Sequence, residues 1–237
     1  RSDYLTADLD GLFLYNTLPT TVLQLLHAHI PSVVEQPACT STNNHVEMQA
    51  KIRNFTPILQ VLELGIDLPD AFDIKGHIYE DQQEFEIKTS IPYIRTSGTN
   101  MENIKIALDN HNEQLELSLS VLNHLPKDNP TAAKLGDIKA GIKLSAKNDA
   151  LDLLVNLENT DKVRNEGIIH AASQLSRNND TVQLDIQILP TNFILNDSSW
   201  NISEANIMYI PAKKIIDVHN FALYTDYQSI AINGRAS

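Results

Sequence analysis

Alternating apolar and polar residues run through most of this chain, whereas amphipathic helical periodicity is confined to a short segment near the start. Each alternating stretch predicts a strand with one apolar and one polar face. Such an apolar face must be covered, and the chain contains almost no amphipathic helix to cover it. We therefore expect a mainly β protein whose sheet faces itself, as a sandwich, a barrel or a folded trough.

Polar turns between these stretches favour antiparallel hairpins. The pattern is clearest where residues 71–79 and 84–91 flank a turn at 81–83, and it recurs up to the C-terminal residues. A proline-containing break interrupts it at 125–130. Farther along, the apolar phase slips by one residue near His219 and Asn220, which predicts a β-bulge and hence a bent sheet. Two more prolines directly follow alternating strands and are expected to end or bend the pairing there.

We divide the chain into a mixed strand and helix segment, 1–68, and an antiparallel β segment of the same elongated sheet, 69–237. In the first segment, the pattern predicts a helix near 19–30, with Thr17 in position to cap it and a proline early in its first turn. Residues 55–64 are expected to add a helical turn or two before a glycine.

Composition excludes several classes of function. The net charge is −12, from 30 acidic and 18 basic residues, and no basic cluster is present, so neither nucleic acid nor anionic lipid headgroups are expected as electrostatic partners. Cys39 is the single cysteine, which excludes an internal disulfide and a cysteine-based zinc site. No stretch approaches the roughly 20 apolar residues that a transmembrane helix needs.

The sequence contains no recognisable catalytic signature. Its eight histidines are scattered, and His27 and His29 would point in different directions on a helix. Carboxylates such as Glu84, Glu86 and Glu116 alternate along strands, which is typical of a solvated face. Neither a phosphate-binding glycine loop nor a nucleophile elbow is present. We therefore expect no enzymatic activity, no cofactor and no metal site.

The segment PTNFILNDSSWNISEANIMYIPAKKIIDVHNFALYTDYQSIAINGRAS, residues 190–237, resembles part of the TamB family, the translocation and assembly module of the AsmA-like superfamily, in its Bacteroidetes form. The order of DLDGLFLYNTLPTTVLQLLHAHIP followed by FDIKGHIY is similar to the repeated middle of these long chains. The chain begins with Arg1 rather than Met and ends in a strand-like pattern. We therefore expect an internal fragment of a longer protein.

This resemblance implies a fold and a function. The fold is a long curved antiparallel sheet folded into an open trough, or β-taco, with one or two short N-terminal helices. The family is anchored in the inner membrane of Gram-negative bacteria and spans the periplasm, where its apolar groove is thought to conduct phospholipid to the outer membrane. The family is also linked to the assembly of outer-membrane and secreted proteins through a BamA-type partner. Neither the anchor nor the partner-binding C-terminal segment is recognisable here.

Together with the apolar pattern, the resemblance predicts which side chains line the groove and contact acyl chains. Burying a methylene gains about 0.8 kcal/mol, so two acyl chains correspond to on the order of 20 kcal/mol, and a lipid released into water would move very slowly. A continuous trough keeps the tails dry while the headgroup stays wet. The predicted lining consists of Phe72, Ile74, Ile78, Phe85, Ile87, Ile91, Ile104, Ile106, Leu108, Leu115, Leu117, Leu119, Ile142, Leu144, Leu153, Val155, Leu184, Ile186, Ile230 and Ile232.

Two other functions fit the same pattern. The chain could be a periplasmic scaffold or chaperone that offers exposed strand edges to outer-membrane proteins by β-augmentation. It could also be a surface β-sandwich binding module, although such a module would usually gather aromatic residues on one loop face. In any of these, strands cut from a longer sheet expose their edges, so we expect self-association through residues 227–236 or 5–15.

Overall fold

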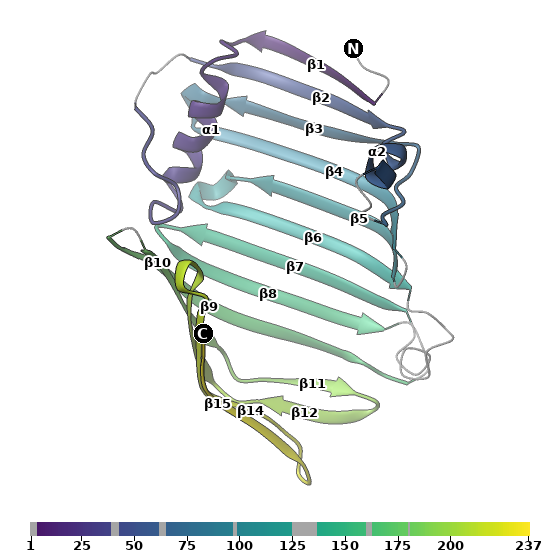
Figure 1. The fold of residues 1–237 in the computed structure, drawn as a ribbon, viewed down its shortest axis with the longest axis vertical. Coiled ribbons are helices and arrows are strands. Elements are labelled where there is room, and N and C mark those ends of the chain that lie inside the picture. The colour runs from purple at the N-terminus through teal and green to yellow at the C-terminus, as the bar shows by residue number, and fades with distance from the viewer. Residues whose placement is uncertain are drawn as a thin grey trace.

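A computed structural model describes residues 4–38, 43–61, 65–96, 99–124, 137–159, 163–179 and 181–237. The expected mainly β fold is confirmed: the described strands form one antiparallel sheet of fifteen members (Figure 1). The break at 125–130 and Cys39 lie outside the described residues. The strands are β1 (Leu5–Leu12), β2 (His45–Arg53), β3 (Ala71–Tyr79), β4 (Glu84–Arg95), β5 (Asn100–Asp109), β6 (Leu115–His124), β7 (Ile138–Lys147), β8 (Ala150–Asn159), β9 (Glu166–Asn178), β10 (Thr181–Ile188), β11 (Thr191–Leu195), β12 (Ser198–Ile202), β13 (Ala205–Ile210), β14 (Ile215–Tyr224) and β15 (Ser229–Ala236).

The sheet is a meander in which strands pair in the order of the sequence. From β1 to β10 each strand pairs with the next. Both β10 and β11 then pair with β9, so they form one long strand that bends at Pro190 between them. The β12–β13 segment pairs with that bent strand in one continuous register, and β14 pairs with both β12 and β13. Antiparallel pairing therefore builds the whole sheet, mostly through short connections, whereas the connections from β1 to β2, β2 to β3 and β6 to β7 are longer.

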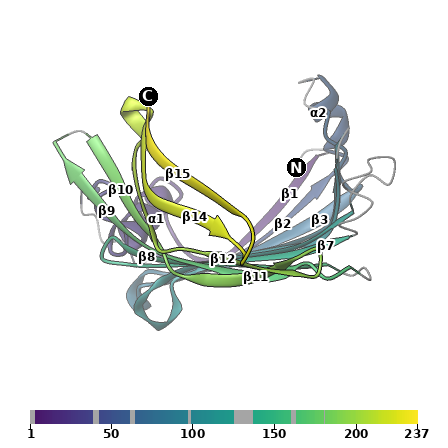
Figure 2. The same ribbon diagram turned by 90° about the horizontal axis from the view of Figure 1, so that it is seen from below.

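The sheet is curved into an open trough, as expected from the sequence. Figure 2 shows the two sides of the sheet rising on the same side of its floor. Bulges contribute to the bending: the register between β14 and β15 shifts between Val218 and Phe221, and Asn220 has a φ of 63°. The bulge predicted near His219 and Asn220 is thus confirmed. A second register shift lies in β5, between Glu102 and Lys105.

Both prolines that were expected to end or bend the pairing, Pro92 and Pro190, lie where strand pairing is interrupted or bent. Pro190 marks the bend between β10 and β11. Strand β4 continues through Pro92 to Arg95 and stays paired with β5, but its pairing with β3 stops at Ser90, and the same edge pairs again only at Arg95, with Asp67. Pro92, which has no N–H group, lies in the gap between these two pairings.

Helix α1 (Leu18–His27) packs across one end of the strands (Figure 1). It confirms the helix expected near 19–30, although it ends earlier. Thr17 occupies the N-cap position, but its side chain caps no helix N–H; the hydroxyl donates to the carbonyl of Leu14 at 3.0 Å. The second, shorter helix, α2 (Thr56–Val61), confirms the helical turn expected in this region. No helix in the described parts of the chain has the length and apolar character needed to span a membrane.

Polar contacts hold α1 at both of its ends. Near its start, the Thr21 hydroxyl donates to the Glu80 carboxylate at 3.3 Å, and the Asn44 backbone N–H donates to the same carboxylate at 2.8 Å. All three side chains are buried. After the helix, the carboxylate of Asp149 in the β7–β8 turn accepts hydrogen bonds from the backbone N–H and the hydroxyl of Ser32, at 2.9 and 2.8 Å. The helix is thereby fixed to both β3 and β7.

Candidate functional site

One face of the sheet carries the apolar side chains from Phe72 to Ile232, and we call it the inner face. Partners in an antiparallel pair point to the same side of a sheet, and side chains along a strand alternate. The pairs Ile78–Phe85, Ile87–Leu108 and Leu117–Leu144 connect the first part of this face. Equivalent pairs continue to Leu223–Ile230 in the last hairpin. The register therefore places every predicted lining residue on the inner face.

Helix α1 covers the inner face at one end only. Its residue Leu25 belongs to a buried cluster with Val46, Ile78, Phe85, Leu115 and Ala146. Leu25 is 2% exposed and Phe85 is 1% exposed. Among the predicted lining residues, Ile91 and Ile104 are also buried.

Away from this helix, the inner face is only partly covered. Ile91 and Ile104 are buried although they are not part of the cluster beneath α1. The other predicted lining residues there are half-buried, and those of β15 are exposed: Ile230 is 55% and Ile232 is 50% exposed. Strands contact their neighbours in the sheet, and no opposing layer of strands packs over them within the described residues. The inner face is therefore an apolar surface that the described chain leaves accessible. Half-buried members of the predicted lining are Phe72, Ile74, Ile87, Ile106, Leu108, Leu117, Leu119, Ile142, Leu144, Leu153, Val155, Leu184 and Ile186.

The central part of the inner face comprises the alternating positions of β3 to β6 between Phe72 and Val121, as far as the bulge in β5. Charged side chains are absent from these positions. Two hydroxyls lie at these positions of β4: that of Tyr93, which donates to the Leu68 carbonyl at 3.3 Å, and that of Thr89, between Ile74 on β3 and Ile106 on β5. The Thr89 hydroxyl donates to the backbone carbonyl of Asp73 at 2.9 Å, so its polar atom is satisfied within the sheet. An acyl chain crossing these strands would therefore meet hydrocarbon without an unsatisfied polar group.

The opposite, outer face has a different character. A shallow depression of about 760 Å³ lies over β3 to β6 on this side, and its lining includes Lys75, Lys88, Lys105, Ser90 and Ser118. Lysine and serine side chains bring polar groups to this side, next to apolar residues such as Ala71, Pro92 and Ala107 in the same lining. The two faces thus differ as the alternating pattern predicts.

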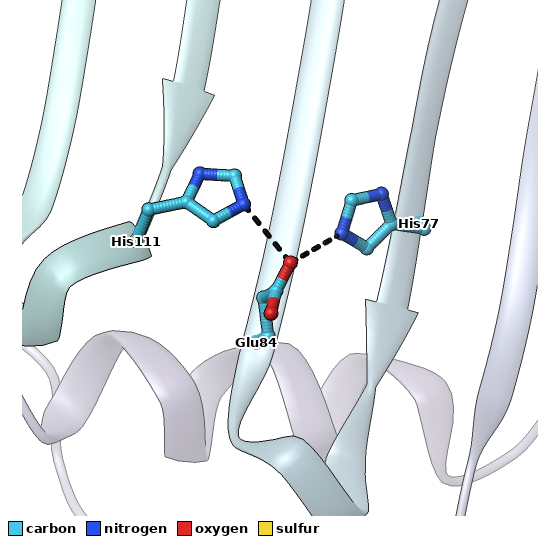
Figure 3. A group of neighbouring side chains, drawn as sticks. All are labelled: His77, Glu84 and His111. Atoms are coloured by element: carbon cyan, nitrogen blue, oxygen red, sulfur yellow. Dashed lines mark hydrogen bonds and ion pairs between the residues drawn. The ribbon is translucent and has the colours of Figure 1, made fainter.

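The outer face also carries a cluster that the sequence did not predict, formed by His77 on β3, Glu84 on β4 and His111 in the turn after β5 (Figure 3). The Nε2 atoms of both imidazoles approach one carboxylate oxygen, Oε1 of Glu84, at 3.1 Å for His77 and 2.9 Å for His111. The Nδ1 atom of His111 lies 3.0 Å from the carboxylate of Asp109. The side chains of His77, Glu84 and His111 are 20%, 31% and 37% exposed.

These contacts shift the pKa values of the cluster in opposite directions. The hydrogen bond with His77, against the effect of burial and with help from His111, lowers the pKa of Glu84. Burial would lower the pKa of His111, but its contacts with Asp109 and Glu84 outweigh burial and raise that pKa. The arrangement therefore favours the ionised Glu84 carboxylate and the protonated form of His111.

The register of the β3–β4 hairpin could have predicted that two members of this cluster, His77 and Glu84, are neighbours. Tyr79 pairs with Glu84 across the β3–β4 turn, which makes His77 and Glu84 diagonal neighbours on one face. The third member could not be placed from spacing alone, because His111 belongs to a separate turn one strand farther along the sheet.

Comparisons with known proteins do not extend this description: no protein-family model matches the chain, and no curated protein or solved structure does so either.

Proposed function

We propose that this chain is a segment of a TamB-type, periplasm-spanning protein whose inner face carries phospholipid acyl chains toward the outer membrane. The observation that supports this most is the accessible apolar inner face, which crosses the sheet from β3 to β15. A protein that needed only stability would be expected to cover such a face with a second layer, because each buried methylene contributes about 0.8 kcal/mol. Here α1 covers only one end.

The trough supplies what lipid movement requires. Acyl tails lying on the inner face would be removed from water, while the open side of the trough leaves room for a hydrated headgroup. Neighbouring strands present similar aliphatic side chains, such as Ile106, Leu119 and Ile142 in one cross-strand row. A tail that slides from one strand to the next therefore exchanges equivalent contacts, so no large barrier separates successive positions.

A second candidate is a scaffold for outer-membrane or secreted proteins, and the sheet edges favour it. Strand β1 pairs only with β2, and β15 pairs only with β14, so each has one edge without a partner among the described residues. An extended segment of another protein could add to either edge. The β-sandwich alternative has less support, since no second sheet packs on the first in the described chain.

Lipid binding tests the proposal. We would purify the protein gently and measure co-purified phospholipid by native mass spectrometry, comparing wild type with the double variant Ile106→Asp/Leu117→Asp. A carboxylate on a dry apolar face costs several kcal/mol, so the variant should lose the lipid while circular dichroism stays close to wild type. The matched control, Lys105→Asp/Ser118→Asp, alters neighbouring positions on the outer face and should keep it. A folded inner-face variant that retains the lipid would contradict the proposal and favour the scaffold.

A further inference from the structure

We propose that His77, Glu84 and His111 form a binding site for a divalent cation of the zinc type on the outer face of the sheet. Two imidazoles and one carboxylate are ligands that zinc accepts, in a set that leaves a fourth position for water. This inference is independent of lipid binding on the inner face.

The positions of the ligand atoms are close to those of a metal site. Zinc binds nitrogen and oxygen at about 2.0–2.2 Å in a tetrahedron, which separates neighbouring ligand atoms by roughly 3.3–3.5 Å. The two nitrogen-to-oxygen distances in the cluster are 3.1 and 2.9 Å, and all three ligand atoms lie within 4.8 Å of one another. To admit the ion, the Glu84 carboxylate would move back from the two nitrogens and the imidazoles would turn toward the vacated position.

Neighbouring groups orient both imidazoles. The carboxylate of Asp109 contacts Nδ1 of His111, which leaves Nε2 directed at Glu84. The ring of Tyr79 stacks on that of His77 with centroids 4.4 Å apart, and the Tyr79 hydroxyl donates to Glu47 at 3.0 Å. Carboxylates on the far nitrogen of a ligating histidine are a regular feature of zinc sites, because they fix the tautomer and make the ligand more basic.

His111 lies between two carboxylates, with Nε2 at 2.9 Å from Glu84 and Nδ1 at 3.0 Å from Asp109. A cation bound at Nε2 would leave the contact between Nδ1 and Asp109 in place. The ion would join β3, β4 and the turn after β5, at the end of the sheet whose other face α1 covers (Figure 3).

Isothermal titration calorimetry with zinc chloride tests this site directly. Wild-type protein should bind one Zn²⁺ ion per chain, and His77→Gln, Glu84→Gln and His111→Gln should each weaken binding more than about tenfold. Asp109→Asn, a positioning change, should weaken it about 10- to 100-fold. Co²⁺ in place of Zn²⁺ should give the visible absorption of a four-coordinate ion in wild type and lose it in Glu84→Gln.

The matched control uses another histidine–carboxylate pair of the outer face that lacks a second imidazole. Nε2 of His170 lies 2.6 Å from the carboxylate of Asp152, so His170→Gln removes a similar contact and should leave zinc binding unchanged. The proposal is overturned if wild type shows no saturable binding. It is also overturned if His77→Gln binds as tightly as wild type, or if His170→Gln loses as much affinity as His77→Gln. Circular dichroism of each variant verifies that the sheet is intact.

Discussion

The two parts of the inner face, one beneath α1 and one beyond it, have the same alternating sequence pattern but a different degree of burial. Phe85 lies under the helix and is 1% exposed, whereas Ile232 lies in the last strand and is 50% exposed. Geometry explains the difference. A helix with its side chains is about 10–12 Å wide, and a ten-residue strand is about 33 Å long. A single helix lying across the strand ends therefore covers only a minor part of their length.

This difference separates two roles within one sheet. The covered end holds a small core and a buried polar network, so it should provide much of the stability. The uncovered part is buried less completely, because its side chains keep some contact with water, and that remaining apolar surface is available for another apolar molecule.

Truncating a core side chain should produce the largest loss of stability and should test this division. We expect Phe85→Ala to lower the free energy of unfolding by about 3–5 kcal/mol, because the site is buried and tightly packed. Leu144→Ala, on the uncovered part of the inner face, should cost less than about 2 kcal/mol. Urea titration measures both values, and equal losses would remove the distinction between the two parts.

Removing the buried carboxylate beneath α1 should have the next largest effect. Glu80→Ala leaves the backbone N–H of Asn44 and the hydroxyl of Thr21 without this acceptor, which should cost about 1–3 kcal/mol. Glu47→Ala is the control, since that side chain accepts an exposed hydrogen bond from Tyr79 and its loss should change stability by less than about 0.5 kcal/mol. Unfolding followed by circular dichroism would settle the comparison, and an unaltered Glu80→Ala variant would show that the network does not hold the helix.

Self-association through the sheet edges should be a weaker effect. Strand β15 is exposed along its whole length and β1 nearly so, and both have an unpaired edge in the described structure. We expect a concentration-dependent dimer in sedimentation velocity, which Ala231→Pro should weaken by removing an N–H group from β15. A wild-type protein that stays monomeric at high concentration would contradict this expectation.

The pH dependence of the covered end should be the smallest of these effects. Burial, with a contribution from Lys147, lowers the pKa of His29 below the value of about 6.5 that is usual for histidine. As the pH falls through about 6.5, the unfolded chain takes up a proton before the folded chain does, so stability decreases until the pH reaches the lowered folded pKa. Replacing His29 by Gln should reduce the loss of stability between pH 7.5 and 5.5 relative to wild type, as measured by urea midpoints. An unchanged loss would show that this histidine does not contribute.

Much of the sheet from β3 onward could be predicted from the sequence because most of its connections are short. With a turn of a few residues, alternation fixes both the partner and the face, which is why Ile78 and Phe85 could be placed on one side before the pairing was known. The bulge at Asn220 was predictable for the same reason, since it interrupts the alternation itself. Burial was not predictable, because the strand pattern is the same whether or not a helix lies over it. The contact between Glu84 and His111 was also missed, since it depends on the arrangement of three segments in space.

Photo-crosslinking from single positions is the most direct test of the central claim that the uncovered inner face holds acyl chains. A photoreactive phenylalanine analogue would replace Leu144 on the uncovered inner face, Lys143 on the outer face, or Ile78 beneath α1, in protein exposed to native membranes. Our account predicts phospholipid adducts at position 144, and none above background at positions 143 and 78, by mass spectrometry of the irradiated protein. Adducts at position 143 equal to those at 144, or their absence from 144 in folded protein, would contradict it.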